Sequence, residues 1–151
     1  MQGVPLQLRE LNIFAPLSEI PKSIGQLKYL ESIAIGSPCP PKKFKSTATL
    51  KRLPDELCYL RSLKYLVFKG FSKMVSLPDS FGELRNLQHV DLEGATSLQM
   101  LPNSFGNLTR LKYLSLKGCE NLTISNGTLG DISMLEYLDL SACKQVKELP
   151  P

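Results

Sequence analysis

The chain has 151 residues, which suits one domain with a hydrophobic core, and 42% of them are apolar. The net charge of +4 is mild, and apart from Lys42, Lys43 and Lys45 the lysines are spread along the sequence, which argues against a nucleic-acid partner. No apolar run approaches the roughly 18 residues that span a bilayer. The start, MQGVPLQLRE, lacks the features of a signal peptide. We therefore expect no membrane partner and, if Met1 is the natural start, a cytoplasmic location.

A short motif, LxxLxL, recurs along the whole chain. Its alternation predicts short strands that place the leucines on one face and variable residues on the other. The first leucines of the motif are Leu8, Leu30, Leu63, Leu87, Leu111 and Leu135. The last three steps are 24 residues each (87−63, 111−87, 135−111), whereas the step from Leu30 to Leu63 is 33 and includes an insertion at about 38–46. This insertion is rich in proline, which cannot extend a central strand, so we expect a surface loop.

A second marker, Leu-Pro, keeps the same place in the repeats. It occurs at Leu53-Pro54, Leu77-Pro78, Leu101-Pro102 and Leu149-Pro150, with Ile20-Pro21 as a variant. We expect an extended corner there, followed by a short helical segment that Asp55, Asp79 or Asn103 caps. Phe81 and Phe105 should fill the core behind it. In the fifth repeat Ser125-Asn126 replaces Leu-Pro and Leu129 replaces the phenylalanine, which predicts a looser corner.

Two markers in register are typical of a leucine-rich repeat. Residues 111–122 show its pattern, LxxLxLxxCxxL. They predict an α/β fold: a right-handed solenoid with a parallel, concave sheet, Leu-Pro corners, and short helical or 3-10 segments on the convex side. Residues 1–151 would form a single domain of about five or six repeats. Because neither end shows a polar cap, we expect a piece of a longer solenoid.

The cysteines and the single histidine give no sign of a metal site or a catalytic centre. Cys119 and Cys143 lie one period apart at an inward position, where we expect neighbouring buried thiols, although a disulfide is geometrically conceivable. No CxxC pair accompanies a histidine-rich cluster. His89 has no catalytic partners, and a Walker-type phosphate loop is missing. The sequence therefore predicts no enzyme, no metal and no cofactor.

The exposed strand residues, which stack into columns from repeat to repeat, are the candidates for function. The residues before the second leucine form an aromatic column: Tyr65, His89, Tyr113 and Tyr137. The residues after the second leucine are Val67, Asp91, Ser115 and Asp139, and those after the third include Lys69, Glu93 and Lys117. Tyrosine is enriched at interface hot spots, which favours a binding role. Cross-strand stacking of rings, and pairing of the alternating charges with one another, are the structural alternatives.

Three glycosylation motifs, at Asn107, Asn121 and Asn126, favour a secreted protein, whereas the missing leader argues against one.

Two strings carry a family resemblance: LPDSFGELRNLQHVDL from Leu77 and LPNSFGNLTRLKYLSLKGC from Leu101. They resemble the leucine-rich repeat region of plant nucleotide-binding disease-resistance proteins. The resemblance covers residues 50–150 well and 1–49 loosely. It implies an intracellular, non-catalytic recognition module in the defence response, with a pathogen effector, a host guardee or the receptor's own nucleotide-binding domain as partner. Two alternatives stay open, a general cytosolic scaffold in signalling and an extracellular ectodomain.

Overall fold

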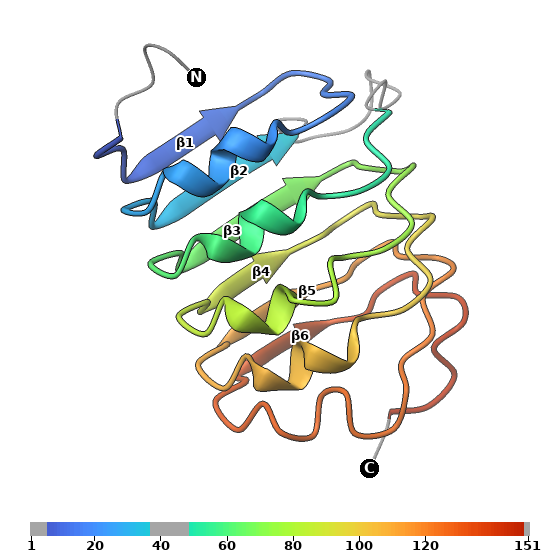
Figure 1. Cartoon of the computed structure of the whole chain (residues 1–151). Helices are drawn as coiled ribbons and strands as arrows, with labels where there is room; N and C mark the ends of the chain where they lie inside the picture. The colour runs from blue at the N-terminus through green and yellow to red at the C-terminus, as the bar shows by residue number, and fades with distance from the viewer. Residues whose placement is uncertain (1–5, 37–48, 150–151) are drawn as a thin grey trace.

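The computed structural model describes residues 6–36 and 49–149, and all structural statements below concern these residues. They form one sheet of six parallel strands arranged in chain order (Figure 1). The strands are β1 (Glu10–Ile13), β2 (Ser32–Gly36), β3 (Tyr65–Lys69), β4 (His89–Asp91), β5 (Tyr113–Ser115) and β6 (Tyr137–Asp139). We number each coil by the strand with which it begins. The predicted solenoid is confirmed, whereas the insertion at 38–46 lies outside the described residues.

The segments opposite the sheet are short 3-10 helices (Figure 1). They are η1 (Lys22–Gln26), η2 (Asp55–Tyr59), η3 (Phe81–Glu83) and η4 (Asn103–Asn107). The predicted capping by Asp55, Asp79 and Asn103 is wrong, because none of these helices has a side-chain cap. The η2 and η4 helices begin directly after an extended proline. The proline carbonyl itself takes the N–H that an aspartate or asparagine cap would bind, as Pro54 does with Leu57 at 3.0 Å.

The leucines of the motif stack into columns that form the core. Leu63, Leu87 and Leu111 are fully buried, and so are the two predicted core phenylalanines, Phe81 and Phe105. The rings of these phenylalanines stack at 5.7 Å with an interplanar angle of 6°. Each fully buried side chain of this size contributes about 1.5–3 kcal/mol. Because every coil buries its leucines against its neighbours, the core runs unbroken along the solenoid.

The fifth and sixth coils are less tightly packed, as the sequence predicts for the fifth repeat. No 3-10 helix forms after Ser125-Asn126, and Leu129 is only half-buried. In the sixth coil the equivalent core positions, Leu135, Leu138 and Leu140, are also only partly buried. Among the described residues β6 pairs with β5 alone, so these leucines pack against one neighbouring coil instead of two.

Cys119 and Cys143 point inward and carry unbridged thiols. The Cys119 thiol donates to the carbonyl of Leu92 at 3.5 Å, and the Cys143 thiol donates to the carbonyl of Leu116 at 3.0 Å. Burial raises the pKa of Cys119 to about 12, with a smaller contribution from Cys143. The buried thiols that the sequence predicts at this inward position are confirmed, and each donates to a backbone carbonyl of the preceding coil.

Candidate functional site

The aromatic column forms as predicted on the concave face of the sheet. The strand register pairs Tyr65 with His89, His89 with Tyr113, and Tyr113 with Tyr137. The ring centroids of His89 and Tyr113 lie 4.0 Å apart and those of Tyr113 and Tyr137 lie 4.5 Å apart, with interplanar angles of 3° and 1°. Tyr65 is tilted by 44° at 6.1 Å from His89. The two end rings, Tyr65 and Tyr137, are each 46% exposed, so the column offers an accessible aromatic surface at both ends.

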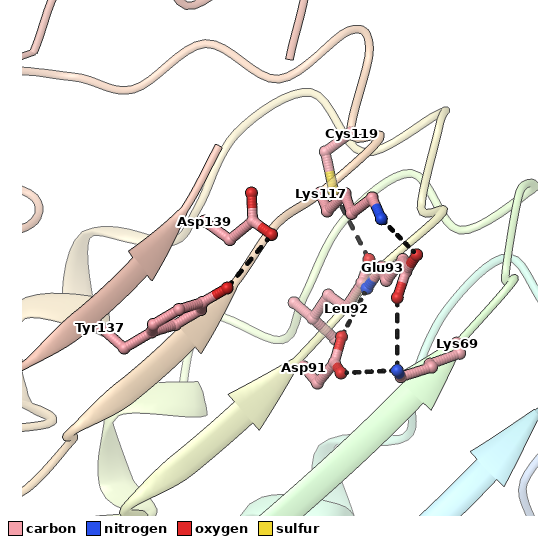
Figure 2. A network of polar contacts seen from close by, with 8 residues as sticks. All are labelled: Lys69, Asp91, Leu92, Glu93, Lys117, Cys119, Tyr137 and Asp139. Carbon is pink, nitrogen blue, oxygen red and sulfur yellow. Dashed lines mark hydrogen bonds and ion pairs between the residues drawn. The ribbon is translucent and has the colours of Figure 1, made fainter. Parts of the chain in front are cut away.

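The charged residues beyond the third leucine form a network within the protein (Figure 2). Lys69 Nζ lies 3.1 Å from Asp91 Oδ2 and 3.3 Å from Glu93 Oε2, and Lys117 Nζ lies 3.6 Å from Glu93 Oε1. Burial disfavours the charge on Lys69, but the hydrogen bonds and charges of Asp91 and Glu93 outweigh it and raise the pKa of Lys69 above its usual range. The cross-strand pairing of Lys69, Glu93 and Lys117 is thus confirmed.

Two residues that the sequence placed on the exposed surface are buried instead. Asp91 is 4% exposed and Ser115 is 3% exposed. Asp91 Oδ1 accepts the N–H of Glu93 at 3.0 Å while its other oxygen faces Lys69, so the carboxylate folds back onto the chain. Ser115 pairs in register with both Asp91 and Asp139, which flank its small side chain. In this column only the half-buried Val67 and Asp139 keep substantial exposure.

Asp139 differs from Asp91 although it occupies the equivalent position two coils later. Its Oδ1 accepts the N–H of Ser141 at 2.8 Å, and its Oδ2 accepts the hydroxyl of Tyr137 at 3.4 Å. The hydrogen bonds from Ser141 lower the pKa of Asp139, so it is ionised at neutral pH. Within the described part of the chain Asp139 has no ion pair, because Lys117 reaches Glu93 instead. Figure 2 shows its carboxylate apart from the lysine network.

His89 is a neutral member of the aromatic column at pH 7. Burial lowers the pKa of His89, Asp91 opposes this effect, and the charge of Lys69 adds to it. A neutral imidazole stacks on Tyr113 without a charge that needs hydration. The sheet therefore presents aromatic rings flanked by the Asp139 carboxylate, which has no ion pair within the described residues.

A second row of polar residues lies in the turns that precede the strands, and the sequence pattern did not predict it. Asn86 Nδ2 donates to the carbonyl of Arg61 at 2.6 Å, and Arg110 donates to Asn86 Oδ1 at 2.8 Å. Arg61 also contacts Glu83 at 3.2 Å. Asn86 and Arg110 lie one 24-residue period apart, so reading the position before the first leucine as a column would have found them. Because their polar groups already hydrogen-bond with one another, they have fewer free hydrogen-bonding groups for a ligand.

In residues 6–36 and 49–149 no group of three or more His, Cys, Asp or Glu side chains is arranged to hold a metal ion. No helix in the same residues is long and apolar enough to cross a membrane.

The repeat geometry has a counterpart in known sequences. Residues 51–150 match the family model of a leucine-rich repeat region. The chain belongs to the leucine-rich repeat family. Curated protein sequences contain no significant match to this leucine-rich repeat chain.

Solved leucine-rich repeat structures share the fold. The ectodomain of the receptor kinase SOBIR1 from Arabidopsis thaliana is 19% identical, with a TM-score of 0.60, over 87% of this chain and 67% of its own. The plant peptide hormone receptor RGFR1, solved in complex with RGF2, is 24% identical, with a TM-score of 0.51, over 90% of this chain and 26% of its own. At these identities the likeness is one of fold, and this chain spans about a quarter of the hormone receptor.

Proposed function

We propose that the concave face of this leucine-rich repeat protein is a non-catalytic surface that recognises another protein. The observation that carries the proposal is the aromatic column, in which stacking holds rings from four adjacent strands in place. Rings that are already ordered lose little side-chain entropy on binding. Tyrosine is also enriched among the residues that dominate binding energy. The exposed Tyr65 and Tyr137 rings supply the accessible ends of this surface.

The charges beside the column favour a partner that presents a basic side chain near Tyr137. Lys69, Asp91, Glu93 and Lys117 already satisfy one another, so a partner would gain little from them and would desolvate them at a cost. Asp139 is ionised and unpaired within the described residues. A lysine or arginine of the partner would pair with this carboxylate and lie close to the Tyr137 hydroxyl, which contacts it at 3.4 Å.

We further infer that this module belongs to a cytoplasmic immune receptor of the plant nucleotide-binding type. Its partner would then be a pathogen effector, a host guardee or the receptor's own nucleotide-binding domain. The strings from Leu77 and Leu101 support this reading, as do the unbridged thiols of Cys58, Cys119 and Cys143, which suit a reducing compartment. The mass of the native polypeptide in its own cells tests the inference, because a receptor is several times heavier than 16.8 kDa.

Site-specific crosslinking tests the recognition surface. A photoreactive amino acid replaces Tyr137 in one preparation and Tyr59, which ends η2 away from the sheet, in another. Proteins from the native cells that crosslink at position 137 but not at position 59 are purified. The affinity of each for the leucine-rich repeat chain is then measured. Replacing Tyr65, Tyr113 and Tyr137 together by alanine should weaken binding by about thirtyfold or more, the effect of a single hot spot.

Two tyrosines outside the sheet give a matched control. Tyr29 and Tyr59 are 60% and 59% exposed, so their double alanine variant removes comparable aromatic surface. It should bind like the parent. If both variants bind equally well while circular dichroism shows intact folds, the aromatic column only supports the sheet and the proposal fails.

An extracellular ectodomain is the second candidate, favoured by two of the glycosylation motifs. The Asn107 and Asn126 side chains are exposed, whereas Asn121 Nδ2 donates to the carbonyl of Thr96 at 2.8 Å. Digestion of the native protein with an N-glycosidase separates the candidates. Loss of mass at Asn107 and Asn126 places the protein outside the cytoplasm, and an unchanged mass supports the receptor proposal.

A further inference from the structure

A ladder of backbone hydrogen bonds connects the coils on the side of the Leu-Pro corners. The Val75 N–H donates to the Lys51 carbonyl at 3.1 Å. In the same way, the Gln99 N–H donates to the Val75 carbonyl at 3.4 Å, and the Thr123 N–H donates to the Gln99 carbonyl at 2.9 Å. An isolated parallel bridge also pairs Arg52 with Ser76. The second to fifth coils are therefore joined here as they are in the sheet.

The ladder stops between the first and second coils. Ser18 is the residue equivalent to Lys51, because it also stands two positions before the apolar residue of the corner, Ile20-Pro21 in the first coil and Leu53-Pro54 in the second. Among the described residues no hydrogen bond joins the Lys51 N–H to the Ser18 carbonyl. The Lys51 carbonyl accepts the Val75 N–H of the third coil. The Val75 N–H points to the coil before it, so we expect the Lys51 N–H to face the first coil in the same way. This stretch thus behaves as the edge of a sheet, with backbone groups that need partners.

The unpaired edge lines a groove with a volume of about 550 Å³, which residues 18–22 and 49–54 form. This volume lies within the roughly 300–1,000 Å³ of ordinary ligand sites. Ile20, Leu50 and Leu53 are the buried apolar residues of the lining, while Lys51 and Arg52 are exposed. The groove therefore combines an apolar floor with an open strand edge, the two features that bind extended peptides.

The charges of the groove select its ligand. Lys51 and Arg52 make no ion pair within residues 6–36 and 49–149, whereas Lys22 is engaged with Glu56 at 3.8 Å. Among the described residues that line the groove, Glu19 is the one that is acidic. We propose that this groove binds an extended acidic segment of a partner protein, which adds a strand beside Lys51 and Arg52. The groove is lined by residues of the first two coils, whereas the aromatic column lies on β3 to β6. The proposal therefore does not depend on the function proposed for that column.

Two model peptides and the exchange of one amide test the proposal. A hexapeptide of alternating glutamate and valine should bind at least about tenfold more tightly than its lysine–valine counterpart. Binding should weaken with added salt. It should also slow hydrogen exchange of the Lys51 amide by about tenfold or more, because that N–H gains an acceptor. The Val75 amide, which is bonded already, is the internal reference.

Charge reversal identifies the site. The Lys51→Glu, Arg52→Glu double variant should lose the preference for the acidic peptide, whereas the Lys28→Glu, Lys147→Glu variant, with the same change in net charge, should keep it. Lys28 and Lys147 are exposed and lie outside the groove. Each of four results overturns the proposal: no binding, equal binding of both peptides, a Lys51 amide that is already protected in the free protein, or self-association that the double variant abolishes. The last two identify the chain itself or a second copy as the occupant.

Discussion

His89 is the one ring of the aromatic column that can gain a positive charge on acidification. It lies between the rings of Tyr65 and Tyr113, and the charged groups that influence it are Asp91 and Lys69. Its pKa is lowered chiefly by burial, so the folded state accepts a proton less readily than the unfolded state. The column is therefore expected to resist protonation until the pH falls below the usual histidine range.

The sign of the resulting pH dependence follows from this difference. Below about pH 6.5 the unfolded state binds more protons at this site than the folded state, so the contribution of His89 to stability is present above that pH and is lost on acidification. The His89→Tyr variant keeps a ring in the column and removes the titration. Urea unfolding at pH 7.5 and pH 5.5 should show a smaller loss of stability for the variant than for the parent. Equal losses would mean that His89 titrates normally in the fold.

Asp91 and Asp139 show how far single residues could be predicted. Their positions differ by 48, which is two periods (139−91), so the sequence places both in one column. Their environments differ because Lys69 pairs with Asp91, while Lys117 turns toward Glu93 instead of Asp139. Either carboxylate can form an ion pair with the lysine, and the sequence pattern does not distinguish between these two pairings. Column membership was predictable, whereas the burial of Asp91 and the unpaired state of Asp139 were not.

The 3-10 helices contact one another through glycines at equivalent positions. A Cβ atom on Gly82 would lie 1.9 Å from the backbone oxygen of Ser104, whereas one on Gly106 would be 3.5 Å from its nearest neighbour, the oxygen of Thr128. Ser104 also holds the two helices together, since its Oγ accepts the Gly82 N–H at 3.0 Å and donates to the Asp79 carbonyl at 2.6 Å. Within the described residues the fifth coil has no 3-10 helix at this place, and the contact is looser.

Alanine at the two glycines should therefore have unequal effects. Gly82→Ala forces η3 and η4 apart and should lower the free energy of unfolding by about 1–3 kcal/mol or more. Gly106→Ala meets only ordinary contacts and should change it by less than about 1 kcal/mol. Urea denaturation of both variants checks this pair. A comparable cost at both positions would show that conformational freedom, and not the close approach of η4, explains the glycine at position 82.

The helix elements also show a departure that the repeat pattern did not predict. Cys58 stands where the neighbouring coils have Gly25 and Gly82, and its buried side chain lies close to Ser80 of the next coil. The helix that follows, η3, begins at Phe81, two residues later than the positions at which η2 and η4 begin in their coils. The sequence predicted a helical segment in each regular coil, but the repeat pattern did not predict this later start of η3.

At the scale of the molecule, stability varies along the solenoid because each coil contacts only its neighbours. The sixth coil is the least buried of the regular coils, and it contains Ala142, whose φ is 59°. Gly70, Gly94 and Gly118 occupy this left-handed position in the preceding coils. A left-handed conformation costs about 1–2 kcal/mol for a residue other than glycine. This conformation destabilises the sixth coil relative to the coils that have glycine at the same position.

Hydrogen exchange should detect that gradient. The amides of Glu136 and Tyr137 donate to the Lys112 carbonyl at 2.9 and 3.0 Å, and those of Lys112 and Tyr113 donate to the Gln88 carbonyl at the same distances. Despite matching hydrogen bonds, Glu136 and Tyr137 should exchange faster. Ala142→Gly should stabilise the sixth coil by about 0.5–1 kcal/mol and slow this exchange. Gly118→Ala, which meets no steric clash, should speed exchange in its own coil. Uniform exchange along the sheet would contradict the gradient.

The periodicity was enough to predict the order and register of the strands, because every 24-residue step returns the chain to the same position in the coil. It was not enough to predict the groove between residues 18–22 and 49–54. That groove depends on how far the first two coils separate at their corners, and the step from Leu30 to Leu63, which is 33 residues long, lies outside the regular period. Where the period fails, the spacing between coils is no longer encoded in the pattern.

The equal 24-residue steps from Leu63 to Leu135 have a consequence for how such a protein changes over generations. Recombination that duplicates or deletes one whole unit leaves every remaining leucine facing its former partners, since neighbouring coils meet through the same contacts. A gain or loss of any other length has to be absorbed within a single coil, as the 33-residue step from Leu30 to Leu63 is, because both leucines stay buried and β2 still pairs in register with β3. Whole-unit exchange would instead lengthen or shorten the row of rings by one, so new binding surfaces arise without a redesign of the interior.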